Sequence, residues 1–471
     1  MLNKIFIPHL ITSTEVLGMG EGSRPKDVYG DYATLTVPKE ELRSTLNIFM
    51  IYMGVLAVIA AIFAGSGLAK MYDPKTTIVV ALIGNTILAI FGGLIAYIGG
   101  STRANTYMIL RYPLGRAGAV LGSLIVSALP LIIWFAVETW LFGITVNVIY
   151  PGNPLTSIAA ASIWGGILMM TTAYFGFRAI ALLSYITVPF WYTLIAIGFF
   201  ASVDLSGGWA KLWTVAPKHI APLAMGITYV FGLYAAGCVI TSDVSRFGRK
   251  KWSGSVAWGT HVLLFMTLLL FAGAAMTLLT GSPNVIVAIA KIGLGLGALL
   301  LAILGQWTTN DNNLWSASLA WINVTGKGSK RLWVIIIGII GTLIAGLWGG
   351  LWGMSLAPFI NFGVLLGVFI PPVGSVMIAD YYIVRKVVGK EYVFGPGTKY
   401  PLVNIAGVVA VIVGGIAGWL ANTYKLHLPT GVGTIDSIIV SFILYLVIAL
   451  GAHFAGVKYT IGEWVERETG F

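Results

Sequence analysis

The densest group of polar residues in the sequence is the run 306–313, which reads QWTTNDNN and interrupts an otherwise apolar stretch. Thr308 and Thr309 offer hydroxyl oxygens, which are neutral hard ligands that suit a small cation such as sodium, and backbone carbonyls can complete its coordination shell. Polar side chains of this kind also commonly hydrogen-bond neighbouring helices. Because eight consecutive residues exceed what such packing requires, we predict a binding function for the run.

Glu138 is an acid with apolar sequence on both sides, in the stretch IIWFAVETWLF. A charge at the centre of a bilayer costs at least about 2.5–3.5 kcal/mol on insertion scales, so this carboxyl group should face a wet cavity or a partner, or remain protonated. Trp134 precedes it by one helical turn and lies on the same helix face. An aromatic surface beside a hydrogen-bonding acid suits a planar heterocycle with N–H donors. The alternative is a packed aromatic residue beside a structural Glu that is bonded to a neighbouring helix.

Two further patterns predict irregular helices. Glycines surround aromatic residues through the stretch 222–245, and they permit the unwound backbone that transporters place at the membrane midplane. This stretch ends with Asp243 and Arg246, which we interpret as an intracellular gate or a simple structural pair. The proline pair at 371–372 must break a later helix, because proline lacks an N–H group and clashes with the preceding turn.

Composition places these residues in a membrane protein. Of the 471 residues, 58% are hydrophobic and only 10% are charged, against roughly a quarter in an ordinary soluble domain. Apolar stretches recur that match the roughly 20 residues a helix needs to cross a bilayer. We therefore predict an all-α polytopic membrane protein of about twelve helices, near 45–69, 76–100, 117–149, 157–176, 178–203, 222–245, 254–280, 294–324, 332–353, 355–384, 402–423 and 433–457.

The basic residues predict the orientation of these helices. The net charge is +11, but Lys and Arg lie mainly in short loops between the predicted spans, which is the pattern of membrane topology. We therefore expect no nucleic-acid partner. With residues 1–44 placed as a cytoplasmic tail, most basic residues fall on the cytoplasmic side, so the bias favours an even number of spans. Both termini are then cytoplasmic, and we expect a multi-pass protein of the cell (plasma) membrane.

The sequence contains no motif of a soluble enzyme. It has neither a Walker A loop nor a zinc-binding helix, its five histidines are scattered, and Cys238 is its one cysteine. We therefore expect no enzymatic activity, no ATP-driven pumping and no cofactor apart from a coupling ion. A non-transporting receptor or scaffold is a remote alternative, because no appended soluble domain is present to transmit a signal.

Three motifs together resemble bacterial cytosine permeases of the nucleobase:cation symporter family. They are WTTNDN at 307–312, PPVGSVMIADYY at 371–382 and SDVSRFGR at 242–249, and the likeness runs from about 45 to 390. The resemblance implies the five-plus-five inverted-repeat (APC/LeuT-like) transporter fold and sodium-coupled uptake of a nucleobase by a monomer. The segments implied are a cytoplasmic tail at 1–44, helices 1–5 at 45–203, helices 6–10 at 222–390, two extra helices at 402–457 and a cytoplasmic tail at 458–471.

The resemblance also implies a sodium site. Its ligands correspond to the carbonyl groups of Gly54 and Ala57, at a break in the first span. The eighth span would supply Gly305, Thr308 and Thr309.

The family's substrate lies between two aromatic residues, which correspond to Trp134 and Tyr234. Asn310 matches an amide that reads the edge of the base. The other positions implied to line the pocket are Val58, Ile59 and Leu233.

Two departures from the cytosine permeases bear on the substrate. The glutamine that those proteins place one turn before the stacking tryptophan is Leu131 here, so that contact is lost. Glu138 matches a position where related carriers, including hydantoin carriers, have glutamine. A carboxylate accepts hydrogen bonds and donates only when protonated, so it favours ligands with two N–H donors. A purine such as guanine is therefore an alternative to cytosine, and proton coupling through Glu138 is an alternative to sodium.

Overall fold

The first membrane span is broken into two helices. α1, Thr45–Leu56, begins at Ser44, whose side chain accepts a hydrogen bond from the Asn47 N–H group. α2, Ile59–Met71, follows at an angle of 57°. Between them Ala57 leaves the helical conformation and Val58 is extended (φ −142°, ψ 142°), and the side chain of Val58 supplies no cap. The break therefore leaves carbonyl groups at the end of α1 and N–H groups at the start of α2 that need partners from elsewhere.

The computed structural model describes residues 27, 29–215, 217, 220–281, 295–352, 356–394, 398–462 and 465–466. The tails predicted at 1–44 and 458–471 lie partly outside these residues. After α2 come the helices α3 (Pro74–Thr102), α4 (Thr106–Ile109), α5 (Arg111–Ser123), η3 (Leu124–Ala128), α6 (Pro130–Ile149), α7 (Ile158–Phe175), α8 (Phe177–Leu205) and α9 (Gly208–Leu212).

The second half of the chain is also helical, with two short antiparallel strand pairs near its end. Its helices are α10 (Leu223–Leu233), α11 (Ala235–Val239), α12 (Thr241–Ser245), α13 (Ser253–Thr260), η5 (His261–Met266), α14 (Thr267–Thr280), α16 (Gly295–Thr325), α17 (Lys330–Leu347), η6 (Trp348–Trp352), α18 (Leu356–Phe369), α19 (Pro371–Ala379), η7 (Asp380–Val384), α20 (Arg385–Val388), α21 (Ile405–Tyr424) and α22 (Gly433–Phe454). Strand β1 (Lys399–Tyr400) pairs with β4 (Val465–Glu466), and β2 (Val403–Asn404) pairs with β3 (Thr460–Ile461).

The predicted class, an all-α polytopic membrane protein, is confirmed. Within the described residues nine helices are long and apolar enough to cross a membrane, or ten if α1 and α2 form one span. Every predicted span coincides with helix, although the count of twelve exceeds that number. Two predicted spans account for the difference. α16 contains the polar run and is therefore less apolar than the nine helices, and the stretch 223–245 is divided into three helices that are each too short to cross a membrane alone.

The sixth predicted span is broken, as its glycines suggested. α10 ends at Tyr234 (φ −126°, ψ 16°), and α11 ends at Ile240 (φ −93°, ψ 13°). At Gly232 a side chain would collide with the backbone of Gly363 in α18, so glycine is required here for close helix packing. Pro371 begins α19 one residue after the end of α18, yet the two helices together still form one apolar span, Ala357–Val388.

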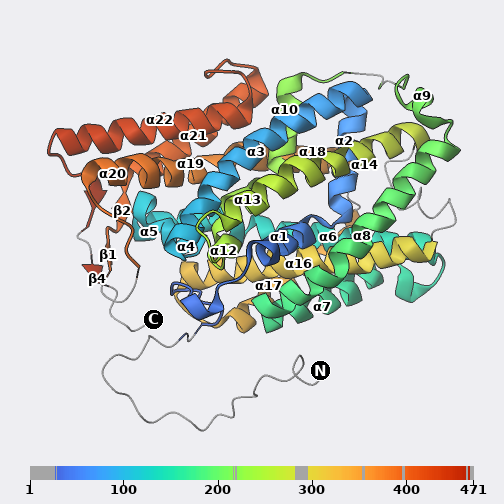
Figure 1. The fold of residues 1–471 in the computed structure, drawn as a ribbon, viewed down its shortest axis with the longest axis horizontal. Coiled ribbons are helices and arrows are strands. Elements are labelled where there is room, and N and C mark those ends of the chain that lie inside the picture. The colour runs from blue at the N-terminus through green and yellow to red at the C-terminus, as the bar shows by residue number, and fades with distance from the viewer. Residues whose placement is uncertain are drawn as a thin grey trace, which may run out of the picture.

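The broken helices lie at the centre of the bundle. α1 packs against α8, α13 and α16, while α10 packs against α3 and α18. α16 is held between α6, α7 and α17. In Figure 1 the pair α21 and α22 lies along one edge of the molecule, away from α16 and α17. The breaks of both central helices are thus enclosed by straight helices.

Candidate functional site

A cavity lies where the two broken helices face α6 and α16. It encloses about 100 Å³, well above the roughly 10–15 Å³ that one water molecule needs. Its walls come from α1, α2, α6, α10, α11, α12, α13, η5 and α16, so both broken helices contribute on each side of their breaks. Its lining includes Tyr52, Val55, Leu56, Val58, Ala60, Ala61, Leu131, Trp134, Glu138, Leu233, Tyr234, Ile240, Met266, Thr309, Asn312, Asn313 and Ser316.

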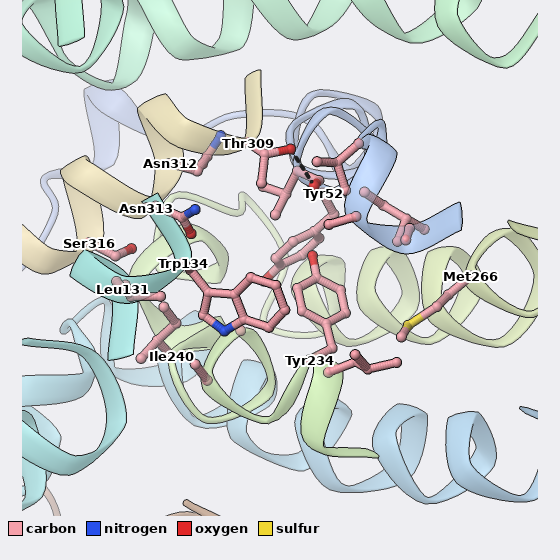
Figure 2. A pocket seen from close by; sticks show the side chains of 18 of the residues that line it. Tyr52, Leu131, Trp134, Tyr234, Ile240, Met266, Thr309, Asn312, Asn313 and Ser316 are labelled. Carbon is pink, nitrogen blue, oxygen red and sulfur yellow. Dashed lines mark hydrogen bonds between the residues drawn. The ribbon is translucent and has the colours of Figure 1, made fainter. Parts of the chain in front are cut away.

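Three aromatic rings gather at the centre of this cavity. Figure 2 shows Trp134 from α6, Tyr52 from α1 and Tyr234 from the α10–α11 break, with the polar side chains of α16 along one side. Trp134 is steadied by an edge-on contact with Phe359, with ring centroids 5.9 Å apart. The two aromatic residues predicted to flank a ligand therefore both line the cavity, together with Tyr52, which the motifs did not indicate.

Glu138 is buried and lines the same cavity. Its carboxylate Oε2 accepts a hydrogen bond from Nε2 of Gln306 at 2.7 Å. The same nitrogen donates to the main-chain carbonyl of Glu138 at 2.9 Å. Oε1 of Gln306 accepts from the N–H group of Ile59, the first residue of α2, at 3.0 Å. Glu138 thus lines the cavity and also bonds a neighbouring helix. The two interpretations of Glu138 from the sequence, a ligand-facing acid and a structural acid, are therefore compatible.

The polar run 306–313 divides over three faces of α16. Thr309, Asn312 and Asn313 line the cavity, one helical turn apart or less. Trp307 and Asp311 turn towards α7 and both bond the Thr172 hydroxyl group, at 2.9 and 3.0 Å. Part of the run therefore serves helix packing, as the alternative interpretation held.

Asn310 occupies the third face and does not belong to the cavity lining. Its Nδ2 lies 3.0 Å from Thr139 Oγ1 and 3.2 Å from the Phe135 carbonyl oxygen, both on α6. Its Oδ1 accepts from Nδ2 of Asn313. In this arrangement the amide of Asn310 cannot read a base edge, because helical phase turns it into α6. Asn313, which Asn310 orients, lines the cavity instead.

Of the residues expected to hold sodium, Ala57, Gly305 and Thr309 lie at the contact between α16 and the break of the first span. The Thr309 hydroxyl group donates to the Val55 carbonyl at 2.8 Å, and the Thr308 hydroxyl group to the Gly305 carbonyl at 2.9 Å. A hydroxyl group that donates its hydrogen keeps two lone pairs that can face a cation. The donor set is neutral, because hydroxyl and main-chain carbonyl oxygens carry no formal charge.

Gly305 permits this close approach. A side chain there would collide with the carbonyl oxygen of Ala57 and with the indole nitrogen of Trp191. At Gly54 it would collide with Ser184 of α8. The break of α1 can therefore touch α16 and α8 only because both positions are glycine.

Of the remaining predicted lining residues, Val58, Leu131 and Leu233 do line the cavity. Ile59 is buried behind it and contributes its main-chain N–H group to Gln306. The sequence run contained Gln306, but no signal in the sequence showed that it would connect Glu138 with α2.

Residue 27 and residues 29–44, which we call the N-terminal segment, pack against the helices next to the cavity. Arg246 is fully buried and donates to the carbonyl groups of Asp31 and Tyr32, each at 2.7 Å. The Asp31 carboxylate in turn accepts from Nε1 of Trp315 at 2.8 Å and pairs with Lys330 at 3.1 Å. The segment is thus fastened to three different helices.

Asp243 does not receive the Arg246 guanidinium on its carboxylate. Arg246 Nε donates to the main-chain carbonyl of Asp243, while the carboxylate accepts from the Thr106 N–H group at 3.0 Å. The Tyr107 hydroxyl group lies 3.0 Å from that carboxylate and 2.9 Å from the carbonyl oxygen of Ser316. Since Ser316 lines the cavity, this network forms its floor.

Comparison with known proteins identifies the family. A family described as permeases for cytosine/purines, uracil, thiamine and allantoin matches residues 36–447. The chain belongs to this permease family. The cytosine permease of Escherichia coli (strain K12) is 30% identical over 409 residues, which cover 87% of this chain and 93% of that permease. The hydantoin permease of Microbacterium maritypicum is 23% identical over 361 residues, covering 70% of this chain and 71% of its own.

Solved structures show the same fold. Mhp1, a nucleobase-cation-symport-1 family transporter solved in a closed conformation with bromovinylhydantoin bound, matches with a TM-score of 0.73 at 18% identity. The match covers 90% of this permease and 96% of Mhp1. A Na⁺-coupled sialic acid symporter matches with a TM-score of 0.61 at 14% identity over 88% of this chain and 91% of its own. The predicted transporter fold and family are confirmed, and the chain is a multi-pass membrane permease, not an enzyme.

Proposed function

We propose that this permease takes up a nucleobase or a related planar heterocycle, of cytosine or purine type, together with sodium. The observation that carries the proposal is the cavity at the two helix breaks, where Trp134, Tyr52 and Tyr234 surround a space also lined by Glu138 and Asn313. Aromatic faces suit the flat surface of a heterocycle, and the polar groups suit its edge. The cytosine and hydantoin permeases that resemble this chain support the same class of solute.

Sodium coupling is supported by the neutral oxygen groups beside the cavity. The carbonyl groups of Gly54, Ala57 and Gly305 and the hydroxyl groups of Thr308 and Thr309 would bind the ion, which would tie the broken first span to α16. Thr309 belongs both to this set and to the cavity wall, so ion and solute would share one side chain. Because Thr309 would contact both, sodium binding and solute binding would be coupled.

Transport would proceed by alternating access in a monomer of the cell membrane with both termini in the cytoplasm. In that orientation the N-terminal segment lies on the cytoplasmic side. Arg246 and Tyr107 would then be the closed intracellular gate, and release of the solute would require Arg246 to leave the carbonyl groups of Asp31 and Tyr32.

Proton coupling through Glu138 is the second candidate, and it is favoured by the placement of a buried acid in the cavity wall. Uptake of radiolabelled bases into proteoliposomes separates the candidates. We expect accumulation that follows an inward sodium gradient at equal pH. Accumulation that follows only a proton gradient would support Glu138 as carrier, and binding with no accumulation under either gradient would support a receptor.

A further inference from the structure

The side-chain amide of Gln306 is held in one orientation by two main-chain groups. Its Oε1 accepts from the N–H group of Ile59, and its Nε2 donates to the main-chain carbonyl of Glu138. A main-chain N–H group only donates and a main-chain carbonyl only accepts, so rotating the amide by half a turn would break both bonds. The second hydrogen of Nε2 must therefore point at the Glu138 carboxylate, as the 2.7 Å distance to Oε2 indicates.

This geometry fixes what Glu138 can offer to a solute. Oε2 accepts a hydrogen bond from Gln306, and Glu138 lines the cavity, so we assign Oε1, which has no bond to Gln306, to the solute. When Glu138 is ionised, Oε1 can only accept hydrogen bonds, and Gln306 occupies one of the acceptor positions of Oε2.

We propose that Gln306 is a positioning residue that sets the hydrogen-bond polarity of the solute site. With Nε2 of Gln306 donating to Oε2, the ionised side chain of residue 138 presents an acceptor at Oε1, and the site then selects heterocycles that carry an N–H or NH₂ donor at the matching edge. The same amide holds the first N–H group of α2, so this selection is tied to the break of the first span. The inference rests on the proposed function, because it assigns Glu138 to the solute site.

The proposal predicts an inversion of preference in Glu138→Gln. The fixed Nε2 of Gln306 can pair only with the carbonyl oxygen of a glutamine at position 138. The amide nitrogen of that glutamine must then face the cavity, where it donates. A site that accepted a hydrogen bond from the solute becomes one that donates to it.

Matched bases measure the inversion. Cytosine and uracil carry opposite donor and acceptor groups at two adjacent ring positions, and so do adenine and hypoxanthine. We expect the ratio of dissociation constants within the better-bound pair to reverse in Glu138→Gln, with a change on the order of tenfold to a hundredfold, as for one mispaired buried hydrogen bond. Asp436→Asn is the control, because Asp436 is a buried acid at the start of α22, away from the cavity. It should leave the ratio unchanged.

The exchange Gln306→Glu with Glu138→Gln tests the role of Gln306 directly. A glutamate at 306 would accept from Ile59 and from the amide nitrogen at 138, which turns the carbonyl oxygen of residue 138 back to the cavity. The wild-type order of preference should return in the double variant. The exchange also brings an oxygen against the Glu138 main-chain carbonyl, so we expect weaker binding overall but the original ranking.

Thermal unfolding without solute provides a second measurement. Gln306→Glu alone places oxygen against oxygen and should lower Tm, and adding Glu138→Gln should recover part of the loss. Unchanged base ratios in Glu138→Gln, a double variant that keeps the inverted ranking, or strictly additive changes in Tm would each overturn the proposal. If the wild type binds no planar heterocycle, the proposed function is wrong. The unfolding experiment would still show whether Gln306 pairs with Glu138.

Discussion

The hydroxyl group of Tyr234 lies 3.3 Å from Nε2 of His261, and the other ring nitrogen of that histidine lies 2.8 Å from the carbonyl oxygen of Trp258. A carbonyl oxygen needs a donor, so Nδ1 carries the hydrogen and Nε2 of the neutral ring accepts from Tyr234. His261 also stacks on Tyr52, with ring centroids 5.2 Å apart. It begins the π-helix η5, a type of irregularity that often marks functional sites. His261 thus contacts two of the aromatic rings that line the cavity, Tyr52 and Tyr234.

We expect His261→Phe to weaken solute binding by about threefold to tenfold, because Tyr234 loses its acceptor while the stacking on Tyr52 is preserved. In a Tyr234→Phe background the same substitution should have little further effect. Isothermal titration of the wild type, the two single variants and the double variant gives the coupling between the two residues. Fully additive losses would show that His261 does not act through Tyr234.

Replacing Thr309 by Ala should raise the sodium concentration for half-maximal uptake by about tenfold, which corresponds to ~1.4 kcal/mol. Thr308→Ala should act in the same direction, since each substitution removes one oxygen from the proposed site. Thr145→Ala is the control, because its buried hydroxyl group bonds the Leu141 carbonyl within α6. If both variants keep the wild-type sodium response, the ion binds elsewhere.

Trp134→Ala should cost on the order of 1–3 kcal/mol in solute affinity, by analogy with base stacking on aromatic side chains in other proteins. Trp164→Ala removes an indole from the outer surface of α7, where the side chain is 38% exposed, and serves as the control. Equal affinities of Trp134→Ala and the wild type in a scintillation binding assay would place the solute in another part of the molecule.

Arg246→Ala should open the floor of the cavity, because the N-terminal segment loses the guanidinium that binds its carbonyl groups. The rate of thiol labelling of Ser316→Cys, measured from the cytoplasmic side in a Cys238→Ala background, should rise several-fold in Arg246→Ala. Arg249→Ala is the matched control, since Arg249 bonds the same segment from an exposed position. A labelling rate that does not change would make the Arg246 contacts structural.

The length of the apolar stretches was sufficient to predict a polytopic membrane protein, and the three motifs predicted the transporter fold through their resemblance to a known family. The sequence also predicted a shared location for Trp134, Glu138 and Tyr234, which come from separate helices and line one cavity. It did not place Asn310 correctly with respect to the cavity. Helical phase counted from Thr309 would have separated Asn313, on the cavity face, from Asn310, which points to α6.

Two contributions had no signal in the sequence. The Ile59 N–H group that orients Gln306 is free only because the first span is broken, and backbone groups leave no trace in side-chain patterns. Tyr52 and His261 stand alone among apolar residues outside the three motifs, so nothing in their neighbourhood distinguished them from core residues. Their role follows from packing between helices that are far apart in the chain.

The attachment of the N-terminal segment has a consequence for how this permease can be shortened or tagged. A chain cut at residue 44 would leave the fully buried Arg246 without two carbonyl partners, and Lys330 without the Asp31 carboxylate. An unpaired buried cation is strongly destabilising, by about 3–5 kcal/mol for a broken buried pair. Fusion partners and truncations for expression or crystallisation should therefore be placed before residue 27, because Asp31 and Tyr32 are bonded into the folded bundle.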